Sequence, residues 1–370
     1  MMRPRSFVQT FFCLMAVAIL ASFAFAQASS SLLVLSKSDH TVSIVDPSSL
    51  QVLARLPSGP DPHEIIASDD GKLAYISNYG GLDSTLNTIS VVDLVSRKAM
   101  PPIDLGAIRS SHGLAFDGGK LYFTAETNKV IGRYDPATQH VDWILGTGQD
   151  RTHMVEVSKS LDKIYTSNVN SATISIIEQV SPPAGGFGPP PGAAPGSGPP
   201  AGPPPQGPGG PGGQPRLTWE ITNVPAGKGV EGFDISPDGK EIWAANARDA
   251  TVTIIDVATK KAIQTLPIPV KGANRLKFTP DGKRVLISGL GARAGDSSLV
   301  IMDAITRKDV KQLNLGGGAA GILIAADGAR AYVAVSMADK VAVVDLKTLE
   351  VVGQIDAGKQ PDGLAWATQK

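Results

Sequence analysis

The sequence predicts an all-β protein, a seven-bladed β-propeller of four-stranded antiparallel blades. Three observations predict it. A unit of roughly 40 to 47 residues recurs along the chain, a period typical of propeller blades. Each copy holds short β-branched runs separated by polar turns, as strands of a meander do. The first copy lacks an initial strand and the C-terminal tail, residues 361–368, supplies one. Pairing these ends would close the ring and leave no open sheet edge.

The most complete copy of the unit spans residues 60–106. We expect its four strands at residues 64–67, 73–77, 88–93 and 99–105, with turns at Asp70-Gly71 and Gly80-Gly81 between them. The chain starts with a partial copy at residue 32, and later copies begin near residues 107, 149, 228, 271 and 318. The propeller domain is therefore expected to cover residues 27–370.

Residues 1–26 resemble a secretion signal. Arg3 and Arg5 provide a positive start, residues 11–25 are apolar, and Ala24-Phe25-Ala26 is a small-x-small cleavage site. The alternative is a membrane anchor, but the run is short for a span. We expect a periplasmic or secreted protein with no transmembrane span in the mature chain. Cys13 is the single cysteine, so the mature chain would have no disulfide and no thiolate ligand.

Residues 181–215 consist almost entirely of proline, glycine and alanine. Such a segment has too few apolar side chains to form a core, and its prolines oppose both helix and sheet. We expect a disordered insertion inside blade four. The alternative is a ligand for a proline-binding partner.

Composition excludes some functions. Lys and Arg together number 34, as do Asp and Glu, and this zero net charge gives no support to a nucleic-acid partner. There is no Gly-x-Ser-x-Gly motif before a helix and no haem attachment motif. We expect a monomer that binds either a small anionic ligand or a protein.

One position of the unit places a side chain from every blade at the mouth of the channel. In the order of blades one to seven, these residues are Asp362, His63, His112, His153, Glu231, Asn274 and Ala320. Imidazole and carboxylate groups around one opening suit Zn²⁺, Cu²⁺ or non-haem iron. We therefore predict metal ligands among His63, His112, His153, Glu231 and Asp362. The alternative is that the histidines are structural and hydrogen-bond neighbouring loops.

Basic residues recur at the junctions between blades, near this mouth. They are Arg109, Arg151, Lys228, Lys271, Arg275 and Lys359. Together with the histidines they would suit a carboxylate, a phosphate or an opened lactone. Glu126, Asn168 and Asn274 would complete a polar pocket. The alternative is an ordinary solvated rim of loops.

The repeats resemble the YVTN family of β-propeller proteins. The tetrad that gives the family its name appears as Tyr75-Ile76-Ser77-Asn78 and Tyr165-Thr166-Ser167-Asn168, and in a looser form as Trp243-Ala244-Ala245-Asn246. The resemblance covers nearly all of the mature chain. Relatives of this repeat include surface-layer proteins, lactonases of the 6-phosphogluconolactonase type and propellers of redox enzymes, so the resemblance implies the fold more than a function.

Three functions follow as predictions. The first is an extracytoplasmic binding or interaction module with a ligand or metal site at the channel mouth. The second is a metal-assisted, lactonase-like hydrolase or lyase acting on a small anion. The third is a redox-associated propeller that holds copper or another cofactor.

Overall fold

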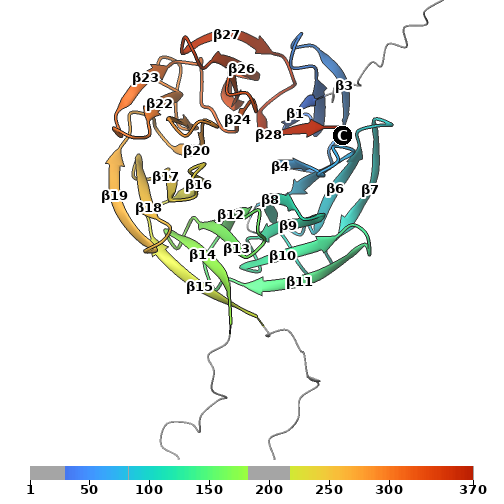
Figure 1. The fold of residues 1–370 in the computed structure, drawn as a ribbon. Coiled ribbons are helices and arrows are strands. Elements are labelled where there is room, and N and C mark those ends of the chain that lie inside the picture. Colours follow the sequence, from blue (N-terminus) through green and yellow to red (C-terminus); the bar gives the residue numbers. More distant parts are fainter. Residues whose placement is uncertain (1–29, 82, 182–216, 370) are drawn as a thin grey trace, which may run out of the picture.

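The computed structural model describes residues 30–81, 83–181 and 217–369. Within these residues, seven four-stranded antiparallel sheets stand around a central channel, which confirms the predicted fold (Figure 1). The predicted signal peptide lies outside the described residues, as does the predicted insertion apart from Ser181. No helix in the described ranges is long and apolar enough to cross a membrane.

Each blade runs from an inner strand at the channel to an outer strand at the rim. The inner strands are β28 (Pro361–Thr368), β4 (Pro62–Ala67), β8 (Ser111–Asp117), β12 (Thr152–Val157), β16 (Val230–Ile235), β20 (Ala273–Phe278) and β24 (Ile322–Ile324). The second strands are β1 (Ser30–Ser36), β5 (Leu73–Asn78), β9 (Lys120–Ala125), β13 (Lys163–Asn168), β17 (Glu241–Asn246), β21 (Arg284–Gly289) and β25 (Arg330–Val335).

The third strands are β2 (Thr41–Val45), β6 (Thr88–Asp93), β10 (Val130–Asp135), β14 (Thr173–Val180), β18 (Thr251–Asp256), β22 (Leu299–Asp303) and β26 (Lys340–Asp345). The outer strands are β3 (Val52–Pro57), β7 (Lys98–Asp104), β11 (His140–Gly146), β15 (Thr218–Pro225), β19 (Lys261–Pro267), β23 (Asp309–Leu313) and β27 (Glu350–Ile355). A short 3₁₀ helix, η1 (Ser336–Ala338), follows β25.

The ring closes as the sequence predicts. Strand β28 pairs antiparallel with β1, so that Leu364 lies opposite Val34 and Thr368 opposite Ser30. The Trp366 indole N–H also donates to the Ile324 carbonyl of blade seven at 2.9 Å. The last strand therefore ties blade one to its own sheet and to the neighbouring blade.

The hydrophobic core lies between blades. The first residue of the aromatic tetrad packs on the inner strand of the following blade: Tyr75 stacks on Phe116, and Trp243 meets Phe278 edge to face at 5.7 Å. Tyr332 meets Trp366 in the same way across the ring closure. Aromatic pairs of this kind contribute roughly 0.5–1.5 kcal/mol beyond their buried area. This packing holds adjacent blades together around the channel.

A β-bulge marks the start of six inner strands. In blade two, Pro62 lies opposite Asn78 and Ile65 opposite Ile76, so His63 and Glu64 together face the single residue Ser77. The same register shift recurs in β8, β12, β16, β20 and β28. Bulges redirect side chains. The mouth residues are thus the second residues of these strands; they were expected just before them.

Candidate metal site at the channel mouth

Two residues of each blade face the mouth, and we name their positions. The mouth position is the one predicted from the sequence. The rim position follows the second strand, directly in blades one to six and after the intervening Ser336 in blade seven, and its N–H donates to the carbonyl of the residue two positions before the mouth position. The rim residues and their acceptors are Lys37 and Gln360, Tyr79 and Asp61, Glu126 and Ser110, Val169 and Arg151, Ala247 and Gly229, Leu290 and Gly272, and Met337 and Gly318.

Three buried side chains meet at blades three and four: His112, Glu126 and His153. One ligand atom from each lies within 4.8 Å of the others, as a shared metal ion requires. The centroids of the two imidazole rings are 3.8 Å apart. His112 Nδ1 is buried and has no hydrogen-bond partner among the described residues. A buried nitrogen without a partner is costly, so this lone pair is available to a ligand.

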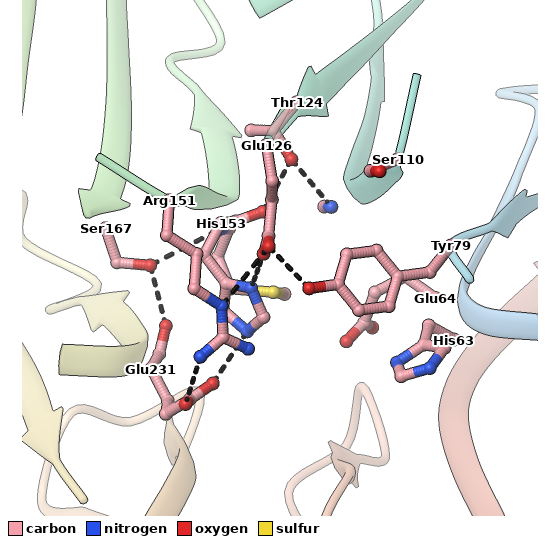
Figure 2. Close-up of polar contacts among 12 residues, drawn as sticks. His63, Glu64, Tyr79, Ser110, Thr124, Glu126, Arg151, His153, Ser167 and Glu231 are labelled. Carbon is pink, nitrogen blue, oxygen red and sulfur yellow. Dashed lines mark hydrogen bonds and ion pairs between the residues drawn. The ribbon is translucent and has the colours of Figure 1, made fainter. Parts of the chain in front are cut away.

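His153 lies between two carboxylates (Figure 2). Its Nδ1 contacts Glu126, and its Nε2 lies 2.8 Å from Glu231 Oε2 without the alignment of a hydrogen bond. Arg151 also bridges both carboxylates, with Nε 3.2 Å from Glu126 Oε2 and Nη1 3.3 Å from Glu231 Oε1. The Tyr79 hydroxyl donates to Glu126 at 2.5 Å. Each carboxylate oxygen of Glu126 therefore has at least one polar contact.

The two histidines have opposite protonation preferences. Burial, and after it the charge of His153, lowers the pKa of His112 well below its ordinary value, so His112 is neutral. Burial also opposes protonation of His153, but Glu231 and Glu126 outweigh it and raise its pKa. Burial raises the pKa of Glu231, yet His153 and Arg151 prevail and lower it to about 2. For Glu126 burial is likewise outweighed, chiefly by His153, and the pKa is lowered.

Hydroxyl groups of the tetrads fix the backbone of the site residues. The Thr124 hydroxyl accepts the Gly113 N–H at 2.9 Å and donates to the His153 carbonyl at 2.6 Å. The Ser167 hydroxyl accepts the Met154 N–H and donates to the Glu231 carbonyl at 2.6 Å. Blades three and four thus each position the mouth residue of the following blade.

The site is built on strained backbone. Arg151, Asp61 and Ser110 have φ values of +57°, +41° and +55°, while Gly229 and Gly272 occupy the equivalent place in blades five and six. A side chain in this left-handed region costs roughly 1–2 kcal/mol relative to the ordinary conformation. Strain of this kind is typical of functional sites. At this position, two residues before the mouth residue, non-glycine residues with positive φ occur only in blades one to four among the described residues, although turns of the other blades contain them as well.

His63 lies beside the triad, in a second polar group. Its Nε2 is 3.3 Å from Asp61 Oδ1, and its Nδ1 is 3.4 Å from Lys37 Nζ and 3.6 Å from Asp362 Oδ2. Its ring centroid is 5.1 Å from that of His112. The structure thus divides the predicted ligands: His112 and His153 converge with Glu126, Glu231 contacts His153, and His63 and Asp362 lie together next to them.

Two of the residues predicted to bind an anion, Arg151 and Arg275, lie at the mouth, and both already form ion pairs with carboxylates. Arg275 Nη2 is 2.5 Å from Glu64 Oε1 of the opposite side of the ring, and Arg275 Nη1 also donates to Asn274. Arg109 donates to the Thr85 carbonyl in an outer loop. The Asn168 amide donates to Ser175 inside its own blade, because the last residue of the tetrad braces the third strand. The predicted loop lysines are exposed: Lys228, Lys271 and Lys359.

Four further groups belong to this site and were not predicted from the sequence: Lys37, Asp61, Glu64 and Tyr79. Lys37 and Tyr79 share the rim position with Glu126, so a second alignment on the residue after each tetrad could have found them. Glu126 was predicted as part of a polar pocket and is found at the centre of the triad.

Below the mouth, the channel holds a cavity of about 450 Å³ lined by apolar residues such as Leu114, Val155 and Leu276. A second charged group lies further along the inner strands. Lys277 Nζ is 2.8 Å from Asp234 Oδ1 and 3.1 Å from Glu156 Oε1. The channel therefore has one charged group toward each end and an apolar section between them.

Comparison with known proteins supports the fold. No protein-family model and no curated protein matches the chain. Among solved structures, a functionally unknown protein from Desulfotomaculum acetoxidans is similar with a TM-score of 0.68 and 11% identity, over 92% of this chain and 99% of that one. A candidate 6-phosphogluconolactonase from Bacteroides uniformis is similar with a TM-score of 0.68 and 14% identity, over 92% and 100% of the chains.

Kuenenia stuttgartiensis hydrazine synthase is similar with a TM-score of 0.62 and 16% identity, over 84% of this chain and 90% of that one. At these identities the three likenesses establish the propeller fold and nothing about chemistry. Membership of the YVTN family stays a prediction from the repeats.

Proposed function

We propose that this protein is an extracytoplasmic binding protein whose channel mouth holds a divalent transition-metal ion between His112, Glu126 and His153. One observation carries the proposal: the unpartnered, buried Nδ1 of His112 lies in a group whose ligand atoms come within 4.8 Å of one another. A purely structural histidine at this burial would have a hydrogen-bond partner.

The donor set suits the ion. Two imidazoles and one carboxylate are ligands of Zn²⁺ and of non-haem Fe²⁺, and imidazole also binds Cu²⁺. His112 is neutral, as a ligand must be, and His153 would release its proton when the ion binds. The Tyr79 hydroxyl holds Glu126 in place from outside. Such outer partners orient metal ligands in many proteins.

The charge balance favours a cation over an anion as the first ligand. The two polar groups at the mouth and the pair below them contain five carboxylates, Asp61, Glu64, Glu126, Glu231 and Asp362, and four cations, Lys37, Arg151, Arg275 and the protonated His153. Both arginines are already paired with carboxylates. A free anion would have to break these pairs, whereas a divalent cation would compensate the excess negative charge.

Hydrolysis of a lactone and a redox role each require chemistry beyond binding. The geometry of the mouth singles out neither, so both stay predictions from the sequence. The secreted or periplasmic location rests on the N-terminal sequence and is part of the proposal.

The experiment is isothermal titration calorimetry of the purified, metal-stripped protein with Zn²⁺, with Cu²⁺ and, under anaerobic conditions, with Fe²⁺. It measures the affinity and the number of ions bound per chain. We expect one ion per chain for the wild type. His112→Gln should weaken binding of the preferred ion by roughly 100-fold, about 2.7 kcal/mol. Visible absorption of a Co²⁺-substituted sample would report whether nitrogen ligands are present.

A matched control is His140→Gln, which changes an exposed histidine at the start of β11. It should bind metal as the wild type does. Equal binding by the His112 and His140 variants, with both folded by circular dichroism, would contradict the proposal.

A further inference from the structure

A groove lies between blades two and three on the face opposite the mouth, where β4 ends and β5 begins. Its volume is about 660 Å³, and both blades contribute apolar walls: Leu73, Tyr75, Val95, Phe116 and Pro136. The rings of Tyr75 and Phe116 stack with their centroids 5.5 Å apart, and Val95 is 62% exposed. A groove of this volume and lining is large enough for a small organic molecule.

Two other junctions between blades are bridged at the corresponding place. In blade five, the Glu241 carboxylate accepts the Trp243 indole N–H at 2.9 Å and pairs with Arg307 of blade six at 2.6 Å. At the junction of blades four and five, Lys260 pairs with Glu178 at 2.5 Å. Lys260 and Arg307 occupy the same left-handed position, in the turn before the outer strand. A basic side chain of one blade thus reaches a carboxylate of the blade before it.

The junction of blades two and three has no such bridge within the described residues. Leu73 begins β5 as Glu241 begins β17, so an apolar side chain stands where blade five has a carboxylate. Gln139 of blade three corresponds to Arg307, because the two have φ values of +59° and +58° and each donates its N–H to the aspartate four residues earlier. The Gln139 side chain is exposed. The groove is therefore open because both partners of the bridge are replaced.

The same replacement leaves a polar atom without a partner. Tyr75 corresponds to Trp243, but Leu73 cannot accept a hydrogen bond as Glu241 does. Tyr75 is 2% exposed, and its hydroxyl has no hydrogen-bond partner in the described part of the chain. Burial raises the pKa of Tyr75 to about 12, so the hydroxyl keeps its proton. Because Tyr75 lines the groove, a ligand there can supply the missing hydrogen bond.

The rim of the groove is negatively charged. It carries three carboxylates and one ammonium group: Asp69, Asp70, Asp93 and Lys72. Lys72 pairs with Asp70 at 3.1 Å, and Asp93 accepts N–H groups of its own turn. One ammonium group therefore faces three carboxylates, and this excess attracts a cation.

Asp69 distinguishes this rim from those of other blades. The corresponding turns of blades five and six have Pro237 and Pro280 instead. Asp69 is exposed and has no ion-pair partner in the described ranges, and its Oδ2 accepts the Gly119 N–H of blade three at 3.3 Å. Asp69 thus adds a negative charge directly at the junction.

We infer that this groove binds a small arylalkyl ammonium ion, with its aromatic ring against Tyr75 and Phe116 and its ammonium group at Asp69. The ring would remove from water the apolar surface of the aromatic pair and of Val95. The negative rim would favour an ammonium group over a carboxylate. The inference is independent of the proposed metal site, which lies at the opposite face of the ring.

The experiment is isothermal titration calorimetry of the full chain with three indoles that share a two-carbon side chain. They are tryptamine, which is a cation, tryptophol, which is neutral, and indole-3-propionate, which is an anion. We expect tryptamine to bind at least about tenfold more tightly than indole-3-propionate, roughly 1.4 kcal/mol, with tryptophol between them. Asp69→Asn should lower the affinity for tryptamine about threefold or more and leave the affinity for tryptophol unchanged.

A second variant closes the groove with the bridge that blades five and six possess. Leu73→Glu/Gln139→Arg should lower the affinities for tryptamine and tryptophol at least about tenfold. The control is Asp309→Asn, which changes an exposed carboxylate of β23 and should keep the wild-type affinities. Circular dichroism checks that the variants fold.

Three results would overturn the inference. The first is equal affinity of the wild type for tryptamine and indole-3-propionate, or no binding of tryptamine. The second is unchanged tryptamine affinity in the folded double variant, since the ligand would then bind elsewhere. The third is unchanged tryptamine affinity in Asp69→Asn, which decides the matter alone if the double variant does not fold.

Discussion

The two charged groups of the channel resemble each other in composition but not in their bonding. Toward the lower end, Lys277 contacts both Asp234 and Glu156, and the Asp234 carboxylate also accepts the Phe278 N–H at 2.7 Å. At the mouth, His112 Nδ1 has no partner, and His153 Nε2 approaches Glu231 without a hydrogen bond.

This difference separates a structural group from a site. In the lower group both carboxylates contact Lys277, so each of these charged side chains has a partner within the group. The mouth leaves His112 Nδ1 buried without a partner, close to left-handed backbone at Arg151 and Asp61. Buried charge is therefore poor evidence for function, and an unpartnered donor or acceptor is better evidence.

The largest expected effect concerns metal binding at the mouth. His153→Gln should lower the affinity for the preferred ion by about 100-fold or more, about 2.7 kcal/mol, because it removes a ligand and its bond to Glu126. Lys277→Met should leave the affinity unchanged. Calorimetry measures both, and comparable losses in the two variants would erase the distinction between the groups.

The next effect concerns stability. Lys277→Met leaves Glu156 and Asp234 without their cation, and we expect the free energy of unfolding at pH 8 to fall by about 2 kcal/mol. This is less than for a fully buried pair, because the Lys277 side chain is 37% exposed. Urea denaturation measures it. If the midpoint of urea denaturation is the same in the variant and the wild type, the lower group does not stabilise the fold.

A third effect depends on pH. Burial raises the pKa of Glu156 from its ordinary 4.5 to about 7, although Lys277 opposes this. Between these values the folded protein holds a proton that the unfolded chain has lost, so stability decreases as pH rises from 4.5 to 7. Relative to Glu156→Gln, the wild type should lose roughly 3 kcal/mol of its free energy of unfolding over this interval. Parallel stability–pH curves for the two proteins would refute the expectation.

The smallest effect tests the role of Arg151. Arg151→Gln removes a positive charge that contacts Glu126 and Glu231. We expect metal affinity to rise about three- to tenfold, roughly 0.7–1.4 kcal/mol, because a cation no longer competes for the carboxylates. Arg109→Gln, in an outer loop, is the control. A fall in affinity would instead make Arg151 a positioning residue for Glu126.

The repeats predicted the ring, its closure by residues 361–368 and the shared position of His63, His112 and His153, because each follows from alignment of one unit on the next. The alignment did not predict that His63 lies in a separate polar group from His112 and His153. This separation depends on which side chains from the rim loops reach them: Glu126 reaches His153, whereas Lys37 reaches His63.

Other parts of the site needed three-dimensional distances. Glu64 and Arg275 are separated by most of the chain and meet only because blades two and six face each other. Asn168 was predicted to lie in a loop and to complete a polar pocket, but its amide donates to the Ser175 hydroxyl inside the blade. Repeat alignment gives the position of a residue in its blade, but not the direction in which a side chain at a strand end turns.

The closing strand has a consequence for how the protein is made. Strand β28 supplies both the seal of the ring and Asp362, a neighbour of His63, and it comes from residues 361–368. A ribosome adds these residues after all other described strands. A chain released before this point would have six complete sheets, an exposed edge on β1 and an incomplete mouth. The ring and the candidate site at its mouth can therefore be completed only after the last strand has been translated, and we expect truncated chains to be open rings that proteases cleave readily.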